Sequence, residues 1–193
     1  IGGGYSGIDK LYAMASVSER NFMGNGQILE CGVQTGGTSR QYTLGFTEPW
    51  LFDIPLSAGV DLYKMEREYD DYDRDSTGGG IRLGYPLFDY VRGYVRYGYD
   101  SSNIDDISAS ASPYILPGTS VESSISTSIV YDSRNRPFNP SEGSKHDFTV
   151  KYAGLGGDIG YTEFKAETGW YFPLFWTTVG FLHGEGGYIF ENS

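Results

Sequence analysis

The segment VESSISTSIVYD, residues 121–132, alternates between two kinds of side chain along almost its whole length. Because successive side chains of a β-strand point to opposite faces, the alternation predicts a strand with one apolar and one polar face. The first face carries Val121, Ser123, Ile125, Thr127, Ile129 and Tyr131, and the second carries Glu122, Ser124, Ser126, Ser128 and Asp132, interrupted only by Val130. Such a strand is suited to a wall between an apolar and an aqueous environment.

The same pattern recurs along the chain in eleven segments, with turn residues between them. The polar faces carry charges, for example the pairs Arg92/Arg96 and Lys165/Glu167. Strands of about ten residues with a polar inner and an apolar outer face are typical of a transmembrane β-barrel. We therefore predict an all-β fold, a transmembrane antiparallel β-barrel, with residues 1–193 as a single domain. The predicted strands are 1–7, 11–19, 27–35, 38–48, 56–67, 77–86, 90–100, 119–132, 144–154, 161–172 and 176–189.

The composition fits a barrel wall and argues against other classes of protein. Aromatic residues make up 16% of the chain, and 28 residues are Gly, a combination that suits barrel walls with aromatic girdles. No run of about 18 apolar residues occurs, which excludes a membrane-spanning helix. The net charge of −11 would repel a phosphate backbone, so we expect no nucleic-acid partner.

Residues that could carry covalent or metal chemistry are sparse. His146 and His183 are too far apart in sequence for a motif such as His-Glu-x-x-His, and no Gly-x-Ser-x-Gly elbow occurs. The acidic run 70–75 is not an EF-hand, because Ser76 and Arg82 stand where that loop needs Gly and Glu. We expect a solvated exterior loop there, no metal or other cofactor, and no enzymatic activity.

Two long irregular stretches, 68–76 and 101–118, both follow odd-numbered predicted strands and therefore lie at one end of the barrel. Outer-membrane barrels have short periplasmic turns and long exterior loops. We therefore expect the chain to start in the periplasm at Ile1 and to finish outside after eleven strands. Bacterial single-chain barrels have even numbers of strands, so the odd number predicts a chain truncated from a larger barrel.

The sharpest local motif is the tract YDSRNRPFNPSEG, residues 131–143, which ends one predicted strand and leads into the next. Asp132 and Arg134 are two residues apart, so they share a face of an extended chain and could pair with each other or with a neighbouring side chain. Gly143 permits a positive φ before the following strand. Taken alone, the tract could be an ordinary barrel turn. The motif residues are Asp132, Arg134, Pro137, Pro140 and Gly143.

This Asp-x-Arg tract, with its prolines and closing glycine, resembles the barrel domain of the BamA family of outer-membrane protein assembly factors. Related assembly barrels, such as TamA and the mitochondrial sorting proteins, share the tract, so the tract alone does not separate them. The resemblance covers nearly all of the chain, because further turns match in order at 21–26, 46–52, 55–59 and 84–87.

The resemblance implies a protein of the bacterial outer membrane that folds and inserts other outer-membrane proteins. It implies nascent outer-membrane proteins and outer-membrane lipids as partners, together with accessory lipoproteins bound through periplasmic POTRA domains upstream of Ile1. A Val-Arg-Gly-Phe loop would follow the last residue, so the arginine of that loop has no counterpart in this sequence.

The opening segment is unusually rich in glycine, which weakens a strand. Barrels that resemble BamA have a first strand that pairs poorly with the last, and the seam between them opens sideways into lipid. The free edge could then template a client strand; the alternative is a frayed first strand without function. The Gly-x-Gly-x-x-Gly spacing lacks the preceding strand and following helix of a dinucleotide site. The seam residues are Ile1, Gly2, Gly3, Gly4, Tyr5, Ser6 and Gly7.

Two other functions remain open on the residues alone. A passive outer-membrane pore would use the charged inner face to select solutes. A two-partner secretion barrel of the same superfamily would instead export one soluble client through its lumen.

Overall fold

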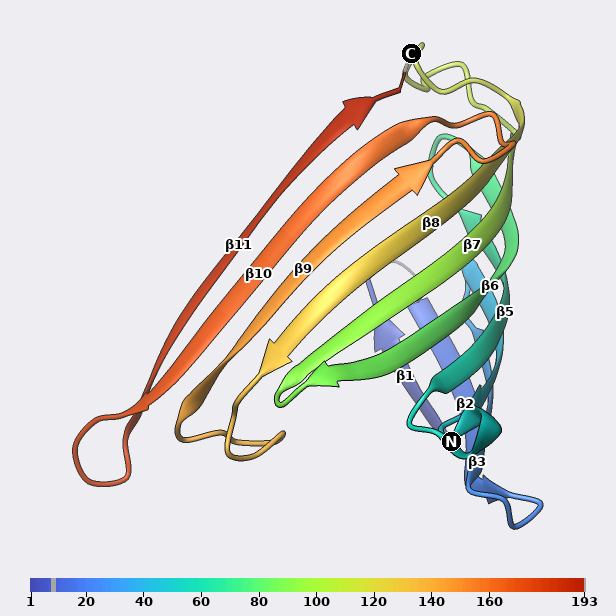
Figure 1. Ribbon diagram of the computed structural model, residues 1–193. Helices are drawn as coiled ribbons and strands as arrows, with labels where there is room; N and C mark the ends of the chain where they lie inside the picture. Colours follow the sequence, from blue (N-terminus) through green and yellow to red (C-terminus); the bar gives the residue numbers. More distant parts are fainter. Residues whose placement is uncertain (8–9, 193) are drawn as a thin grey trace.

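A computed structural model describes residues 1–7 and 10–192 of the protein. Within them the chain forms one antiparallel sheet of eleven strands, each paired with its neighbours in sequence (Figure 1). The predicted all-β class and the predicted number of strands are confirmed. The strands are β1 (Gly2–Ser6), β2 (Lys10–Phe22), β3 (Gln27–Thr35), β4 (Ser39–Glu48), β5 (Ser57–Glu68), β6 (Asp73–Phe88), β7 (Val91–Asp105), β8 (Gly118–Asp132), β9 (Gly143–Ala153), β10 (Tyr161–Pro173) and β11 (Val179–Glu191).

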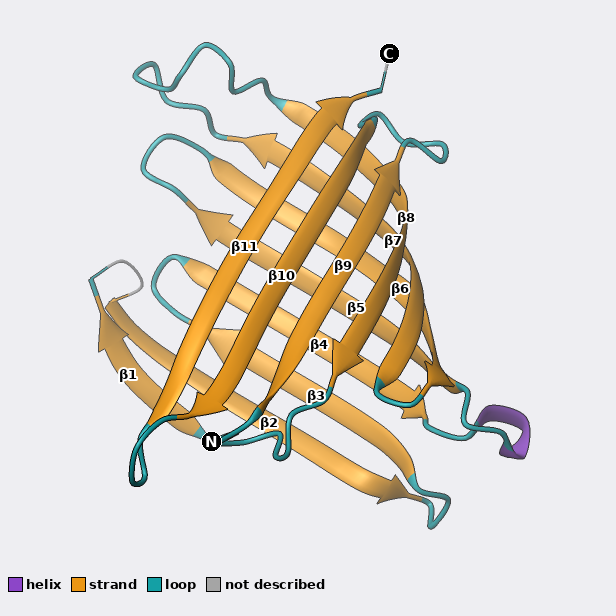
Figure 2. Ribbon diagram, turned by 60° about the vertical axis from the view of Figure 1, so that its left-hand side comes forward, coloured by secondary structure: helices purple, strands orange, loops and turns teal. Residues whose placement is uncertain are grey.

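The sheet is strongly curved, so that strands from its two ends lie across a shared interior (Figures 1 and 2). The strand order runs from β1 to β11, and no pairing among the described residues joins these two strands. A short 3₁₀ helix, η1 (Leu51–Asp53), lies in the connection between β4 and β5. No helix in the described chain is long and apolar enough to cross a membrane.

One face of the sheet is apolar and has little protein cover. The register places Val60, Ile81, Tyr97 and Ile125 side by side on four neighbouring strands, and each of these side chains is 40–54% exposed. Ala153 is the one apolar residue that is buried in the described part of the chain. A water-soluble sheet would bury such a face against a second layer, whereas lipid covers it in a membrane barrel.

The opposite face is polar, and ion pairs join neighbouring strands across it. Arg82 on β6 contacts Asp61 on β5 at 2.6 Å and also donates a hydrogen bond to Thr47 on β4. Because charged side chains are costly on a lipid-facing surface, this face belongs to the interior of the barrel. Two further pairs of this kind are Lys151–Glu122 at 2.7 Å and Lys165–Glu185 at 2.8 Å.

The predicted irregular stretches 68–76 and 101–118 are wrong in part. β6 already begins at Asp73, and β7 continues to Asp105, so the connections shorten to 69–72 and 106–117. The additional strand residues of β6 and β7 are packed together. The hydroxyl oxygens of Ser76 and Ser102 lie 2.7 Å apart, and these two residues are only 2% and 5% exposed. A strand that has left the apolar band needs no alternation of side chains, so the sequence pattern stops before the strand does.

This correction removes the predicted difference in length between the connections at the two ends. The longest connection at one end is 106–117, and the longest at the other is 133–142. Connection length therefore does not distinguish an exterior from a periplasmic end. The two ends of the sheet are named here. The turn end holds the connections β2–β3, β4–β5, β6–β7, β8–β9 and β10–β11, and the loop end holds the other connections.

The connection 133–142 is folded back tightly on itself. Asn135 accepts a hydrogen bond from the backbone N–H of Ser141 at 3.1 Å and donates one to its hydroxyl at 2.8 Å. Gly143 closes the turn with a φ of +98°, and an added Cβ would overlap the carbonyl oxygen of Ser133. The predicted need for glycine at this position thus has two causes, a left-handed backbone and a close backbone approach.

Replacing Gly143 by Ala is expected to lower the free energy of unfolding by about 2–3 kcal/mol, because the left-handed conformation and the overlap both disfavour a side chain. The measurement is the urea unfolding midpoint of the complete protein in phospholipid vesicles. Gly156→Ala is the matched control, since Gly156 has a φ of +96° but open space around it. Its expected cost is about 1 kcal/mol, and equal losses in the two variants would rule out the close approach as a cause.

Candidate functional site

The first strand is the shortest of the sheet. β1 has five residues against thirteen in β2, and its register with β2 runs from Gly2 opposite Met14 to Ser6 opposite Lys10. Along residues 2–5, the backbone edge that faces away from β2 is not joined to a strand among the described residues. Of the predicted seam residues, Gly2–Ser6 form β1, and Ile1 precedes it. Gly7 lies just beyond it, in a turn.

The glycines of β1 are covered by side chains from β2. A Cβ added at Gly4 would lie 2.7 Å from the hydroxyl oxygen of Tyr12, and one at Gly2 would lie 2.9 Å from the terminal methyl of Met14. Gly2 and Gly4 share the interior face of the strand, so β2 supplies the side chains that β1 lacks on this face. Tyr5, on the apolar face, is 78% exposed. The strand is thus held on one side only, by its five-residue pairing and two crossing side chains.

A groove of about 270 Å³ opens beside this strand. Its lining runs from Ile1 and Gly2 across Met14 on β2 to Gln34 on β3 and Gln41 on β4. Because Gly2, Met14, Gln34 and Gln41 follow one another in register, the groove lies over the interior face of β1 to β4, on the β2 side of β1.

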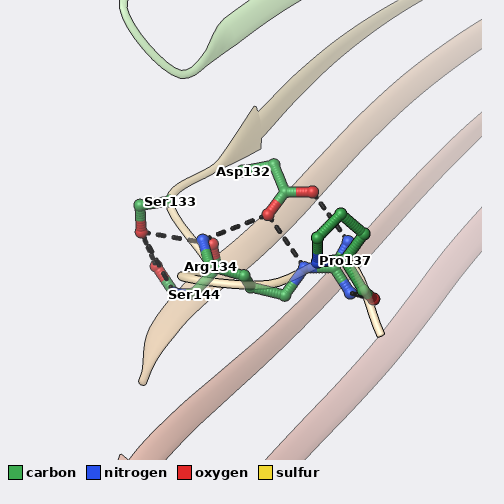
Figure 3. A network of polar contacts seen from close by, with 5 residues as sticks. All are labelled: Asp132, Ser133, Arg134, Pro137 and Ser144. Carbon is green, nitrogen blue, oxygen red and sulfur yellow. Dashed lines mark hydrogen bonds and ion pairs between the residues drawn. The ribbon is translucent and has the colours of Figure 1, made fainter. Parts of the chain in front are cut away.

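The predicted Asp132–Arg134 pair forms within the tract itself (Figure 3). Arg134 Nε donates to Asp132 Oδ1 at 2.8 Å, and its terminal Nη2 reaches Oδ2 at 2.7 Å. The hydrogen bonds that the guanidinium donates to the Asp132 carboxylate raise the pKa of Arg134 above its ordinary value, so the pair stays charged on both sides. The guanidinium side chain is only 17% exposed, and this fork geometry is the strong form of such a contact.

The tract also binds its own backbone. Arg134 Nη1 donates to the carbonyl oxygen of Pro137 at 3.4 Å, and the backbone N–H of Ser144 donates to the hydroxyl of Ser133 at 3.1 Å (Figure 3). Pro140 lies in the same connection, before Gly143. These contacts bring the predicted motif residues together in one locally closed turn.

A cavity of about 700 Å³ lies between this tract and the β6–β7 connection. Its lining includes Asp132 and Arg134 together with Arg92, Tyr94 and Lys145 from the interior face. The last three residues did not emerge as candidates from the sequence, although the alternation placed Arg92 on the polar face. Only the strand register shows that they converge at the turn end.

The sequence-predicted residues therefore separate into two places. β1 lies at one edge of the sheet, and six strands stand between it and the end of β8, where the Asp132 tract lies. The described residues contain no group of three or more His, Cys, Asp or Glu side chains that could hold a metal ion. Asp71 in the acidic run instead accepts hydrogen bonds from Ser108 at 3.0 Å and Ser110 at 2.9 Å, which tie the 69–72 connection to 106–117.

Three comparisons with known proteins agree with this architecture. The chain is 27% identical over 173 residues to the outer membrane protein assembly factor BamA of Neorickettsia risticii, covering 86% of this chain and 23% of that protein. It is 27% identical over 199 residues to the protein of the same name from Nitratidesulfovibrio vulgaris, covering all of this chain and 25% of that protein. The chain thus spans about a quarter of the length of these relatives.

A solved structure shares the fold. The crystal structure of BamA from Haemophilus ducreyi lacking POTRA domains 1–3 matches 98% of this chain and 40% of that chain, with a TM-score of 0.76 at 20% identity. The resemblance to BamA barrels and the location in the bacterial outer membrane are confirmed. The Omp85 superfamily domain matches residues 21–193. Because this match spans far more than half of the sequence, the chain belongs to the Omp85 superfamily.

Proposed function

We propose that this chain is the part of an outer-membrane assembly barrel whose first strand receives the β-strands of client proteins, so that the protein folds and inserts other barrels. The observation that carries the proposal is the weakness of β1, a five-residue strand with three glycines that is joined to β2 over only five residue pairs. Relatives of similar sequence bear the name outer membrane protein assembly factor, which supports assembly as the general role.

The proposal rests on the cost of unpaired backbone groups in lipid. A client strand that enters a bilayer must pair every N–H and C=O group, because the hydrocarbon supplies no partners. A backbone hydrogen bond has a gross strength of about 4–6 kcal/mol in an apolar medium. The edge along residues 2–5 presents such groups in an extended conformation, so a client could pair with it by strand addition.

The same edge must also release its client, which requires weak pairing. β1 is joined to β2 over five residue pairs, whereas β10 is joined to β11 over thirteen. Its glycines add no packing and lose more conformational entropy on ordering than other residues do. Separating β1 from β2 therefore costs less free energy than separating any of the longer strands from its neighbours.

We further propose nascent outer-membrane proteins and outer-membrane lipids as partners, with accessory lipoproteins contacted through other parts of the complete protein. Strand exchange needs no covalent step, so the proposal includes no enzymatic activity, no cofactor and no nucleic acid. Passive transport and secretion through the lumen are the competing functions, and they need a stable wall but no mobile edge.

The first test locks the edge. In a Cys31→Ser background, Gly3→Cys is paired with a cysteine on the strand that faces β1 in the complete protein. Oxidation is expected to abolish client insertion into vesicles, and reduction is expected to restore it. Val60→Cys with Ile81→Cys is the matched control, because these residues lie opposite each other within the wall. Insertion at the normal rate with the edge locked would exclude strand addition at this seam and favour a pore or secretion barrel.

The second test measures how easily the edge opens. Amide hydrogen exchange along β1 is expected to be at least ~100-fold faster than along β3 or β10, since weakly paired segments open locally at low cost. The measurement is exchange mass spectrometry of the complete protein in vesicles, with β3 as a control strand that is paired on both sides. Equal protection in β1 and β3 would contradict the weak-edge proposal.

A further inference from the structure

The cavity at the turn end holds positive charge that its own carboxylates do not neutralise. Its lining includes the three cations Arg92, Arg134 and Lys145, against the two carboxylates of Asp89 and Asp132. Asp89 lies in the β6–β7 turn and forms no ion pair with these cations in the described chain. One positive charge is therefore left over, in a protein whose net charge is −11.

Only one of the three cations has a carboxylate to itself. Arg134 binds both carboxylate oxygens of Asp132. Lys145 lies opposite Asp132 in the β8–β9 register, yet neither Lys145 nor Arg92 forms an ion pair within the part of the chain that the structure describes. Arg92 and Lys145 therefore remain available to a partner. Other interior cations contact a carboxylate at 2.6–2.8 Å, namely Arg82, Lys151 and Lys165.

A single valine keeps Arg92 unpaired. Val130 is the one apolar residue on the polar face of β8, and the register places it between Arg92 on β7 and Asp147 on β9. The backbones of β7 and β9 are two strand spacings apart, about 10 Å, so Asp147 does not reach Arg92 across the valine. Val130 also lines the cavity. It thus gives the cavity an apolar floor beside an unpaired guanidinium.

The walls of the cavity are also largely apolar. Phe88 and Tyr90 are 78% and 65% exposed, so their rings are accessible to a ligand. The volume of about 700 Å³ falls within the range of ligand pockets, about 300–1,000 Å³. The cavity therefore combines an apolar surface with two unpaired cations. The apolar and aromatic wall residues are Pro86, Phe88, Tyr90, Tyr94 and Pro137.

We propose that this cavity binds an acidic segment of a polypeptide, with carboxylates on Arg92 and Lys145 and an apolar side chain against Val130. The interior face of a barrel is turned away from lipid, so the ligand comes from the aqueous side. Charge complementarity identifies the polypeptide. Clients of the proposed function are barrel walls, and the wall described above has 25 acidic against 14 basic residues. This use of the cavity rests on the proposed function, whereas the binding of an acidic peptide does not.

The first experiment measures binding of a peptide that copies residues 185–192. This stretch of barrel strand has a glutamate on each side of Tyr188, Ile189 and Phe190. The peptide is blocked at both ends and labelled with a fluorophore, and its affinity for the complete protein in detergent micelles is measured by fluorescence anisotropy. A control peptide with glutamine in place of both glutamates is expected to bind at least ~10-fold more weakly, because it lacks the charged acceptors. Added salt is expected to weaken only the acidic peptide.

Variants of the protein locate the site. Arg92→Gln combined with Lys145→Gln is expected to lower the affinity at least ~10-fold. Val130→Asp is expected to have a similar effect, because the new carboxylate lies opposite Arg92 in the register and takes the place of the ligand. Arg96→Gln is the matched control, since it removes the same charge from the same face of β7 but does not line the cavity. The urea unfolding midpoint of each variant is measured as well, so that lost folding is not mistaken for lost binding.

Three results would overturn the proposal. Absence of binding would mean that the cavity is closed to a peptide in the complete protein, and equal affinity for the two peptides would exclude recognition of the carboxylates. A loss of affinity in Arg96→Gln as large as in the double variant would place the peptide elsewhere. Locking the β1 edge through Gly3→Cys is expected to leave the peptide affinity unchanged. Normal client insertion with that edge locked would therefore count against the proposed function but not against this site.

Discussion

Every part of this structure depends on an apolar sheet face that no other part of the described chain covers. Val60, Ile81 and Tyr97 are side by side and half exposed, and a soluble protein would have to bury them. Lipid provides that cover, and it imposes the second condition, that every backbone group within the membrane be paired. The curved sheet meets this condition through pairing between neighbouring strands. Only the edges of such a sheet are left to seek partners.

This condition also explains why the two predicted groups of residues behave differently. The Asp132 tract satisfies much of its hydrogen bonding locally, through Arg134, Pro137 and the neighbouring Ser144. β1 depends on β2 for its packing and presents its other edge outward. The contacts of the tract are mostly local, whereas β1 is the segment that is proposed to meet a partner.

The sequence predicted the strands well, because the alternation of apolar and polar side chains reflects directly the lipid on one face of the sheet and the aqueous interior on the other. It also placed Asp132 and Arg134 on one face, since they are two apart on an extended chain, but it did not decide whether they pair with each other or with a neighbour. The prediction stopped short at Asp73–Ser76 and beyond Asp100, where polar residues stand on both faces and alternation carries no information. The covering of Gly4 by Tyr12 and the convergence of Arg92 with Lys145 depend on register between strands, which a single sequence does not contain. The left-handed backbone at Met23, Phe52, Tyr90 and Trp176 could likewise not be predicted, because Met, Phe, Tyr and Trp are not turn-forming residues.

The local closure of the Asp132 tract has a consequence for how the protein itself folds. Its contacts join residues at most eleven positions apart, so the entropy lost on forming them is small. β8 and β9 can thus form a hairpin with its register already set before distant strands arrive. From that nucleus strands can be added one at a time in both directions, and β1, seven strands away, would be among the last to join. The molecule proposed to guide the folding of others would then begin its own folding in the middle of its wall.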